Sequence, residues 1–227
     1  DKYPGVSPYV YCANNPVRLV DPDGREIYEF DKKGNLINTI ENTNVDIIRV
    51  VNKRGKVLFE SKPYKYGTIT EVIRDPSKSD KTILSIKDND SRVSIFENLA
   101  YHTKVEWMTI HAEKGSEEKN FISTSRSSDH GESILPYNLK DEEYTATECS
   151  HSHPRNIFGG NFPSGYGFFG DKINGGDKRL FFQLKQMWPG IDVKVFDANN
   201  GHYYRLGPLP ETVTEIDRNG IEKPFNK

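Results

Sequence analysis

The segment EYTATECSHSHP, residues 143–154, places two histidines one residue apart at the end of a run typical of a β-strand. Successive side chains of a strand point to opposite faces, so residues two apart share a face. His151 and His153 can therefore aim both imidazoles at one point. Pro154 cannot extend the hydrogen-bond ladder, so we expect the strand to end there and to leave the pair at the rim of a sheet. The segment predicts half of a metal site.

A catalytic zinc site needs a third protein ligand and an open position for water. Asp171 and Asp177 lie downstream and could each supply that ligand. Asp177 opens a segment whose apolar residues fall on one face of a helix: Leu180, Phe181, Leu184, Met187 and Trp188. Asp171 lies in a loop with glycines on both sides. We therefore favour Asp177 as the ligand, with Asp171 as the alternative. Considered alone, Asp177 would be interpreted as an ordinary helix N-cap.

Activation of a metal-bound water also requires a base, and Glu106 in VEWMTI, residues 105–110, is the candidate. On a strand it would share a face with Met108 and Ile110, an unusual place for a carboxylate unless a polar group lies there. A carboxylate beside a metal could take the proton of the water and pass it to a leaving amine. The other interpretation is a charge at the edge of a sheet. Glu148 is a weaker candidate, because it should point to the opposite face of the histidine strand.

Ser164, in the segment FPSG, could donate a hydrogen bond to a developing oxyanion, although a serine in a turn is the commoner explanation. The other histidines show no pattern that predicts a partner, and they are assigned no role: His102, His111, His130 and His202. Cys12 and Cys149 are too few for a disulfide scaffold. We interpret Cys149 as a buried thiol, with a single disulfide between the two as the alternative.

The charge and the hydrophobicity of the chain argue against a nucleic-acid-binding protein and against a membrane-spanning protein. The chain of 227 residues has a formal net charge of −2, which gives no electrostatic signature of nucleic-acid binding. Its apolar runs are only a few residues long, so no segment predicts a transmembrane helix. We expect neither a nucleic-acid partner nor a membrane span.

Periodicity predicts an α+β fold, with a mostly antiparallel sheet flanked by helices and preceded by short β-hairpins. EIYEFDKKGNLINTI (26–40) and DIIRVVNKRGKVLFE (46–60) each place a turn containing glycine between alternating apolar residues, which is a hairpin signal. We expect such antiparallel hairpins throughout a linker region, residues 26–88. The main domain should span residues 89–210, and residues 211–227 should form a loosely held tail.

Within the main domain, a helix is expected from about residue 91, with Asp90 or Ser91 as its N-cap. A second helix should begin at Asp177. We expect strands over 104–114, 120–125 and 143–151 and a final hairpin over 191–206. The polar region 126–143 is expected to be a loop.

The first residues carry one resemblance to a known family. YPGVSPYVYCANNPVRLVDPDGRE, residues 3–26, resembles the motif PxxYxYxxNNPVxxxDPDG that ends the core of Rhs/YD-repeat polymorphic toxins. The resemblance implies that residues 1–25 are the terminus of an Rhs core and that an effector follows. Such an effector would be secreted or delivered into a target cell as part of a larger toxin. The chain starts at Asp1, and we expect it to be a fragment of a longer protein.

Residues 90–206 carry a second resemblance. VEWMTI, HSHP, PS and a GD at a helix start are similar to the motifs of the JAMM/MPN (JAB-like) zinc metallopeptidases. The resemblance implies that His151, His153 and an aspartate bind Zn²⁺, that Glu106 is the general base and that Ser164 assists the oxyanion. The family has Ser-x-x-Asp, whereas here GYGFFGDKINGGDKRL follows Ser164. We interpret this difference as an inserted loop, which leaves Asp177 as the ligand.

The leading hypothesis is a toxin effector that hydrolyses an amide bond as a zinc peptidase or isopeptidase, through a metal-activated water. Its substrate would be a protein or peptide, with ubiquitin-like and isopeptide-linked conjugates as candidates. Toxins of this kind usually have an immunity protein as a partner. One alternative is a metal-dependent nuclease toxin, which the near-neutral charge disfavours. Another is a non-catalytic binding domain on a JAMM-like fold, which the displaced aspartate favours.

Overall fold

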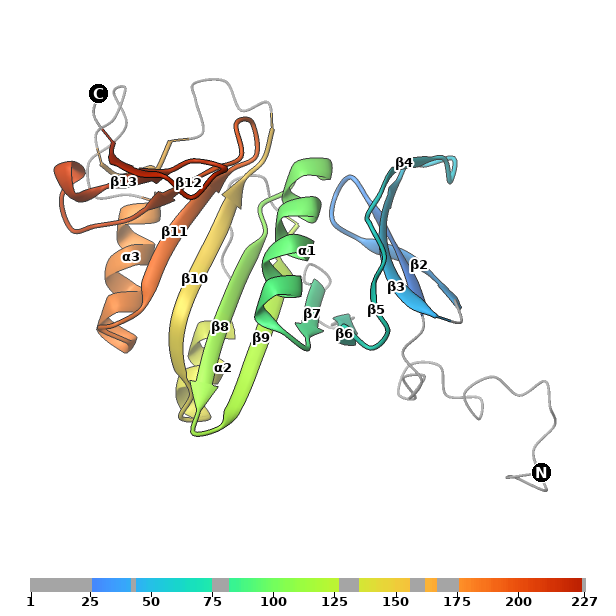
Figure 1. Cartoon of the computed structure of the whole chain (residues 1–227), viewed down its shortest axis with the longest axis horizontal. Helices are drawn as coiled ribbons and strands as arrows, with labels where there is room; N and C mark the ends of the chain where they lie inside the picture. Colours follow the sequence, from blue (N-terminus) through green and yellow to red (C-terminus); the bar gives the residue numbers. More distant parts are fainter. Residues whose placement is uncertain are drawn as a thin grey trace.

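The computed structural model describes residues 26–41, 44–74, 82–126, 135–155, 162–166 and 176–225. The expected Rhs core terminus, Cys12, His130 and Asp171 lie outside the described residues. The described residues form two sheets and three α-helices, and most strand pairs are antiparallel (Figure 1). The expectation of an α+β fold with a mostly antiparallel sheet is therefore confirmed.

The N-terminal sheet has the strand order β2-β1-β3-β4, with β5 also paired to β3. Its strands are β1 Glu26–Asp31, β2 Leu36–Glu41, β3 Val45–Val51, β4 Val57–Glu60 and β5 Tyr64–Lys65. The two predicted hairpins are present as β1–β2 and β3–β4, but β1 and β3 join them in parallel. This parallel register places Tyr28 beside Ile48 and Phe30 beside Val50, so the buried residues of both hairpins line one face.

A second sheet has nine strands in the order β14-β13-β12-β11-β10-β8-β9-β7-β6. Its strands are β6 Ile69–Arg74, β7 Thr82–Ile86, β8 Met108–Lys114, β9 Glu117–Thr124, β10 Thr145–His153, β11 Asp192–Asp197, β12 His202–Arg205, β13 Thr214–Ile216 and β14 Glu222–Pro224. Among the described strands of this sheet, β10 and β11 are the one parallel pair. Because β6 and β7 belong to it, the second sheet begins within the region expected to be a linker.

Helices pack on both faces of the nine-stranded sheet. Helix α1, Asn89–His102, shares a core with β7, β9 and the N-terminal sheet, which lies beside it in Figure 1. Helix α3, Gly176–Met187, packs through Phe181 and Leu184 on the opposite face, over β8, β10 and β11. The N-cap of α1 is Asp88, whose side chain accepts a hydrogen bond from Ser91 N, so the expected caps at Asp90 and Ser91 were wrong.

Two segments are more ordered than the sequence indicated. Helix α2, Leu135–Asp141, lies within the region expected to be a loop, and it buries Leu139 in the core. Residues 211–225 do not form a loose tail, because β13 and β14 extend the sheet and Val213 and Phe225 are buried. Short segments with few apolar residues give too weak a period to be recognised. No helix among the described residues is long and apolar enough to span a membrane.

Candidate metal centre

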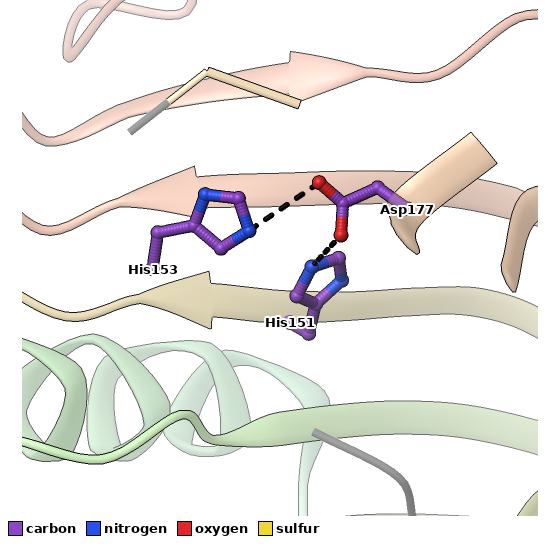
Figure 2. Close-up of side chains that lie close together, drawn as sticks. All are labelled: His151, His153 and Asp177. Atoms are coloured by element: carbon purple, nitrogen blue, oxygen red, sulfur yellow. Dashed lines mark ion pairs between the residues drawn. The ribbon is translucent and has the colours of Figure 1, made fainter. Parts of the chain in front are cut away.

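The histidine pair lies at the end of β10, in the middle of the nine-stranded sheet. His151 faces Met108 of β8 and Val195 of β11 in the register, and its side chain is only 4% exposed. The rings of His151 and His153 lie on one face with their centroids 5.2 Å apart, as strand alternation predicts (Figure 2). The strand ends at His153, directly before Pro154. This end of β10 therefore presents to α3 one buried imidazole, that of His151, and one partly buried imidazole, that of His153.

Asp177 completes the cluster from the first turn of α3. Its Oδ1 lies 2.7 Å from His151 Nε2, and its Oδ2 lies 3.3 Å from His153 Nε2 (Figure 2). One ligand atom from each of the three residues lies within 4.8 Å of the others, which makes the group a candidate metal-binding triad. The amphipathic helix predicted from residue 177 thus delivers this carboxylate to the predicted histidines.

The electrostatics of the cluster favour an ionised carboxylate. Burial alone would raise the pKa of Asp177, but the charges and hydrogen bonds of His151 and His153 outweigh burial and hold that pKa well below its usual value. Asp177 is therefore in the protonation state that a metal ligand requires. The other ring nitrogen of His151, Nδ1, is buried and has no hydrogen-bond partner among the described residues.

Ser164 lies directly against the start of α3. Its backbone N–H donates to Asp177 Oδ2 over 2.5 Å, and Asp177 N donates to Ser164 Oγ over 2.9 Å. The serine predicted to act near the site is thus in contact with the predicted aspartate, although 13 positions separate them in the sequence. Its hydroxyl oxygen accepts one hydrogen bond, and its hydroxyl hydrogen can still be donated.

Glu106 lies just before β8 rather than within it, because that strand begins at Met108. The residue is buried, with 8% of its surface exposed. Thr124 Oγ1 donates to Glu106 O over 2.6 Å, and the next residue, Trp107, donates its N–H to Ser152 Oγ over 3.0 Å. The backbone around Glu106 is therefore fixed to β9 on one side and to β10 on the other.

The register of β8 and β10 relates Glu106 to the histidines. Met108 lies opposite His151, and Ser152 N donates to Trp107 O over 2.8 Å, which continues the same register. Counting one residue further along each chain in this register places Glu106 opposite His153. Residues opposite each other on antiparallel strands are neighbours on the same face. The predicted base therefore lies at the same end of the sheet as the candidate triad, but it is not one of the three clustered ligands.

Glu148 faces the other side of β10, as predicted. Its carboxylate pairs with Arg92 Nη2 of α1 at 2.5 Å and with Lys194 Nζ at 2.7 Å. Burial would raise the pKa of Glu148, but Lys194 and Arg92 outweigh burial and lower it. A carboxylate held in these ion pairs on the α1 face cannot serve the histidines. Sequence reasoning missed the fully buried Arg92, because its partner Glu148 lies 56 positions away.

Three of the unassigned histidines have partners away from the triad. His202 Nδ1 lies 2.5 Å from Glu215, His111 Nδ1 lies 2.8 Å from Asn120 Oδ1, and His102 stacks on Phe59 with ring centroids 3.7 Å apart. Cys149 is a free, buried thiol, as expected, and burial raises its pKa to about 12. A thiol with so high a pKa is unreactive at neutral pH.

Part of the chain that carries these residues matches a known protein family. Residues 84–180 match the family model described as JAB-like toxin 1. The matched segment includes His151, His153, Asp177, Glu106 and Ser164. The match supports a JAB-like toxin domain in this part of the chain, and a domain of this family fits an effector delivered into target cells. Searches of the curated proteins and of the solved structures returned no match.

Proposed function

We propose that the JAB-like toxin domain is a zinc-dependent peptidase or isopeptidase that acts as a toxin effector. The observation that carries the proposal is the convergence of His151, His153 and Asp177, whose ligand atoms lie within 4.8 Å of one another. Two imidazoles and one carboxylate form a donor set typical of catalytic zinc sites, in which a fourth position stays open for water.

The environment of the three ligands suits the ion. Imidazole nitrogen and carboxylate oxygen are both good ligands for zinc. Asp177 is held ionised, and all three side chains are largely shielded from solvent, which strengthens electrostatic interactions at the site. The triad has three protein members among the described residues, whereas a structural zinc site usually has four.

When bound, zinc would lower the pKa of a coordinated water and polarise the carbonyl of the substrate. Glu106, whose backbone is fixed across from His153, would accept a proton from the attacking water. As the carbon–nitrogen bond breaks, Glu106 would return that proton to the leaving nitrogen. Ser164 would donate its hydroxyl hydrogen toward the carbonyl oxygen, because its Oγ already accepts from Asp177 N. The products would be a carboxylate and an amine.

The test uses the full chain loaded with one equivalent of zinc and incubated with a peptide library and with ubiquitin-like and isopeptide-linked conjugates. Mass spectrometry should identify a cleaved amide bond. Glu106→Gln should lower the rate by about 10²- to 10⁴-fold, the usual contribution of a general base, and should still bind zinc. Glu113→Gln is the matched control, because its side chain on β8 is 49% exposed, and it should retain full activity.

Other outcomes would favour the alternatives. Cleavage of plasmid DNA or of total RNA, with no peptide or conjugate cleaved, would identify a metal-dependent nuclease toxin. Tight zinc binding without any hydrolysis would identify a non-catalytic binding domain. Unchanged amide hydrolysis by Glu106→Gln would remove that residue as the base.

A further inference from the structure

The start of α3 is attached to Ser164 by three hydrogen bonds. Asp177 N donates to Ser164 Oγ over 2.9 Å, and Lys178 N donates to Ser164 O over 3.2 Å. In return, Ser164 N donates to Asp177 Oδ2 over 2.5 Å. The first N–H groups of a helix have no partner within the helix. Ser164 therefore caps α3 from a distant part of the sequence, with a reciprocal exchange of bonds like that of a capping box.

This cap also fixes the carboxylate of Asp177. Oδ2 accepts from Ser164 N and lies 3.3 Å from His153 Nε2, whereas Oδ1 lies 2.7 Å from His151 Nε2. The contacts with Ser164 restrain both the backbone and the side chain of the aspartate. The orientation of the third ligand is therefore set by Ser164 as well as by the histidines.

Gly176 makes the close approach of Ser164 sterically possible. Its φ of +47° lies in the left-handed region that glycine adopts readily. A Cβ at this position would lie 1.7 Å from Ser164 Oγ and 2.9 Å from Ser164 Cβ. Any larger residue would displace Ser164 from the start of α3.

We infer that Ser164 and Gly176 are positioning residues, which hold Asp177 over the histidine pair. The inference rests on metal binding at the proposed site, and it does not depend on which bond the protein hydrolyses. The direct contact between Ser164 and Asp177 also explains how two residues 13 positions apart in the sequence can act at one site. The two residues are distant in the sequence but in direct contact in the fold, so the interval does not loosen the third ligand.

The test is the zinc affinity of the full chain, measured by competition with a chromogenic chelator. Ser164→Ala removes the bond that Asp177 N donates to Ser164 Oγ and leaves the backbone bond to Oδ2, so it should weaken zinc binding by about 10-fold, the lower end of the range typical when a residue that supports a metal ligand is changed. Gly176→Ala should weaken it at least as much, because the added methyl group displaces Ser164. Ser164→Thr keeps the hydroxyl and should bind zinc more tightly than Ser164→Ala does.

The matched control is Asp88→Ala, which removes the side-chain cap of α1, a 2.8 Å hydrogen bond from Ser91 N, away from the triad. Thermal unfolding of the metal-free proteins reports the loss of stability in each variant. Asp88→Ala should lose stability but keep the zinc affinity of the wild type. If Ser164→Ala and Gly176→Ala bind zinc as tightly as Asp88→Ala does, the inference is overturned and the metal site stands. If the wild type binds no zinc, both the inference and the proposed function fail.

Discussion

Phe30 of β1 connects the N-terminal sheet to the part of the chain that carries Glu106. Its side chain is fully buried and meets the edge of Trp107, with ring centroids 5.9 Å apart and an interplanar angle of 81°. Trp107 follows Glu106 directly. Nearby, Lys104 N donates to Lys32 O over 2.8 Å. We therefore predict that the N-terminal sheet unfolds together with the nine-stranded sheet and supports the segment before β8.

The perturbation is Phe30→Ala. Removal of a fully buried phenylalanine ring from a core costs about 3–5 kcal/mol of the free energy of unfolding. In a chain of this size each kcal/mol lowers Tm by about 2–4 °C, so the expected decrease is about 6–20 °C. The control is Phe182→Ala on α3, where the side chain is 49% exposed and the same deletion should change stability by about 0.5 kcal/mol or less.

Urea and thermal unfolding are followed by tryptophan fluorescence and by far-ultraviolet circular dichroism. Both probes should report one transition, and it should shift by the same amount in Phe30→Ala. A decrease of less than about 1 kcal/mol, below the range for buried rings, would show that the contact with Trp107 is unimportant. Two separate transitions, with only the first one shifted, would show that residues 26–65 fold independently.

Three further predictions concern charge and metal. Burial raises the pKa of Glu97 above its ordinary 4.5 despite the hydrogen bond from Tyr203, so wild-type stability should fall as pH rises through the folded-state pKa. Glu97→Gln does not titrate, and its Tm relative to the wild type should rise between pH 4 and pH 8; a constant difference would contradict this assignment. Arg92→Ala should cost about 3–5 kcal/mol in urea unfolding, because it removes one buried partner of Glu148; a cost below about 1 kcal/mol would show that Lys194 alone suffices. Zinc at about 1,000 times its Kd should stabilise the chain by about 4 kcal/mol, and EDTA should reverse the shift in Tm; a Tm insensitive to zinc would count against the site.

Much of the candidate site follows from local patterns in the sequence. The alternation of a strand places His151 and His153 on one face, and the apolar period after residue 177 places an aspartate at the start of a helix. Both signals depend on residues close together in the chain. Glu148 was likewise assigned to the opposite face from strand alternation alone, and its pairing with Arg92 agrees with that assignment.

Contacts between distant residues could not be predicted in this way. The bonds between Ser164 and Asp177 join segments that no period or spacing relates. The parallel pairing of β1 with β3 depends on matching the buried faces of two hairpins, each of which predicts only its own antiparallel pair. The short, polar sequences of β13 and β14 gave no strand signal. These strands form by pairing with β12 and with each other, next to the buried neighbours Val213 and Phe225.

We propose that His151, His153 and Asp177 bind one zinc ion. The most direct test is the zinc content of the purified full chain after metal loading and desalting, measured by mass spectrometry of the element. We expect close to one zinc per chain in the wild type and in the control His202→Ala, and close to none in the His151→Ala/His153→Ala double variant. A wild type without zinc, or a double variant that retains the same amount as the wild type, would contradict zinc binding by these three residues.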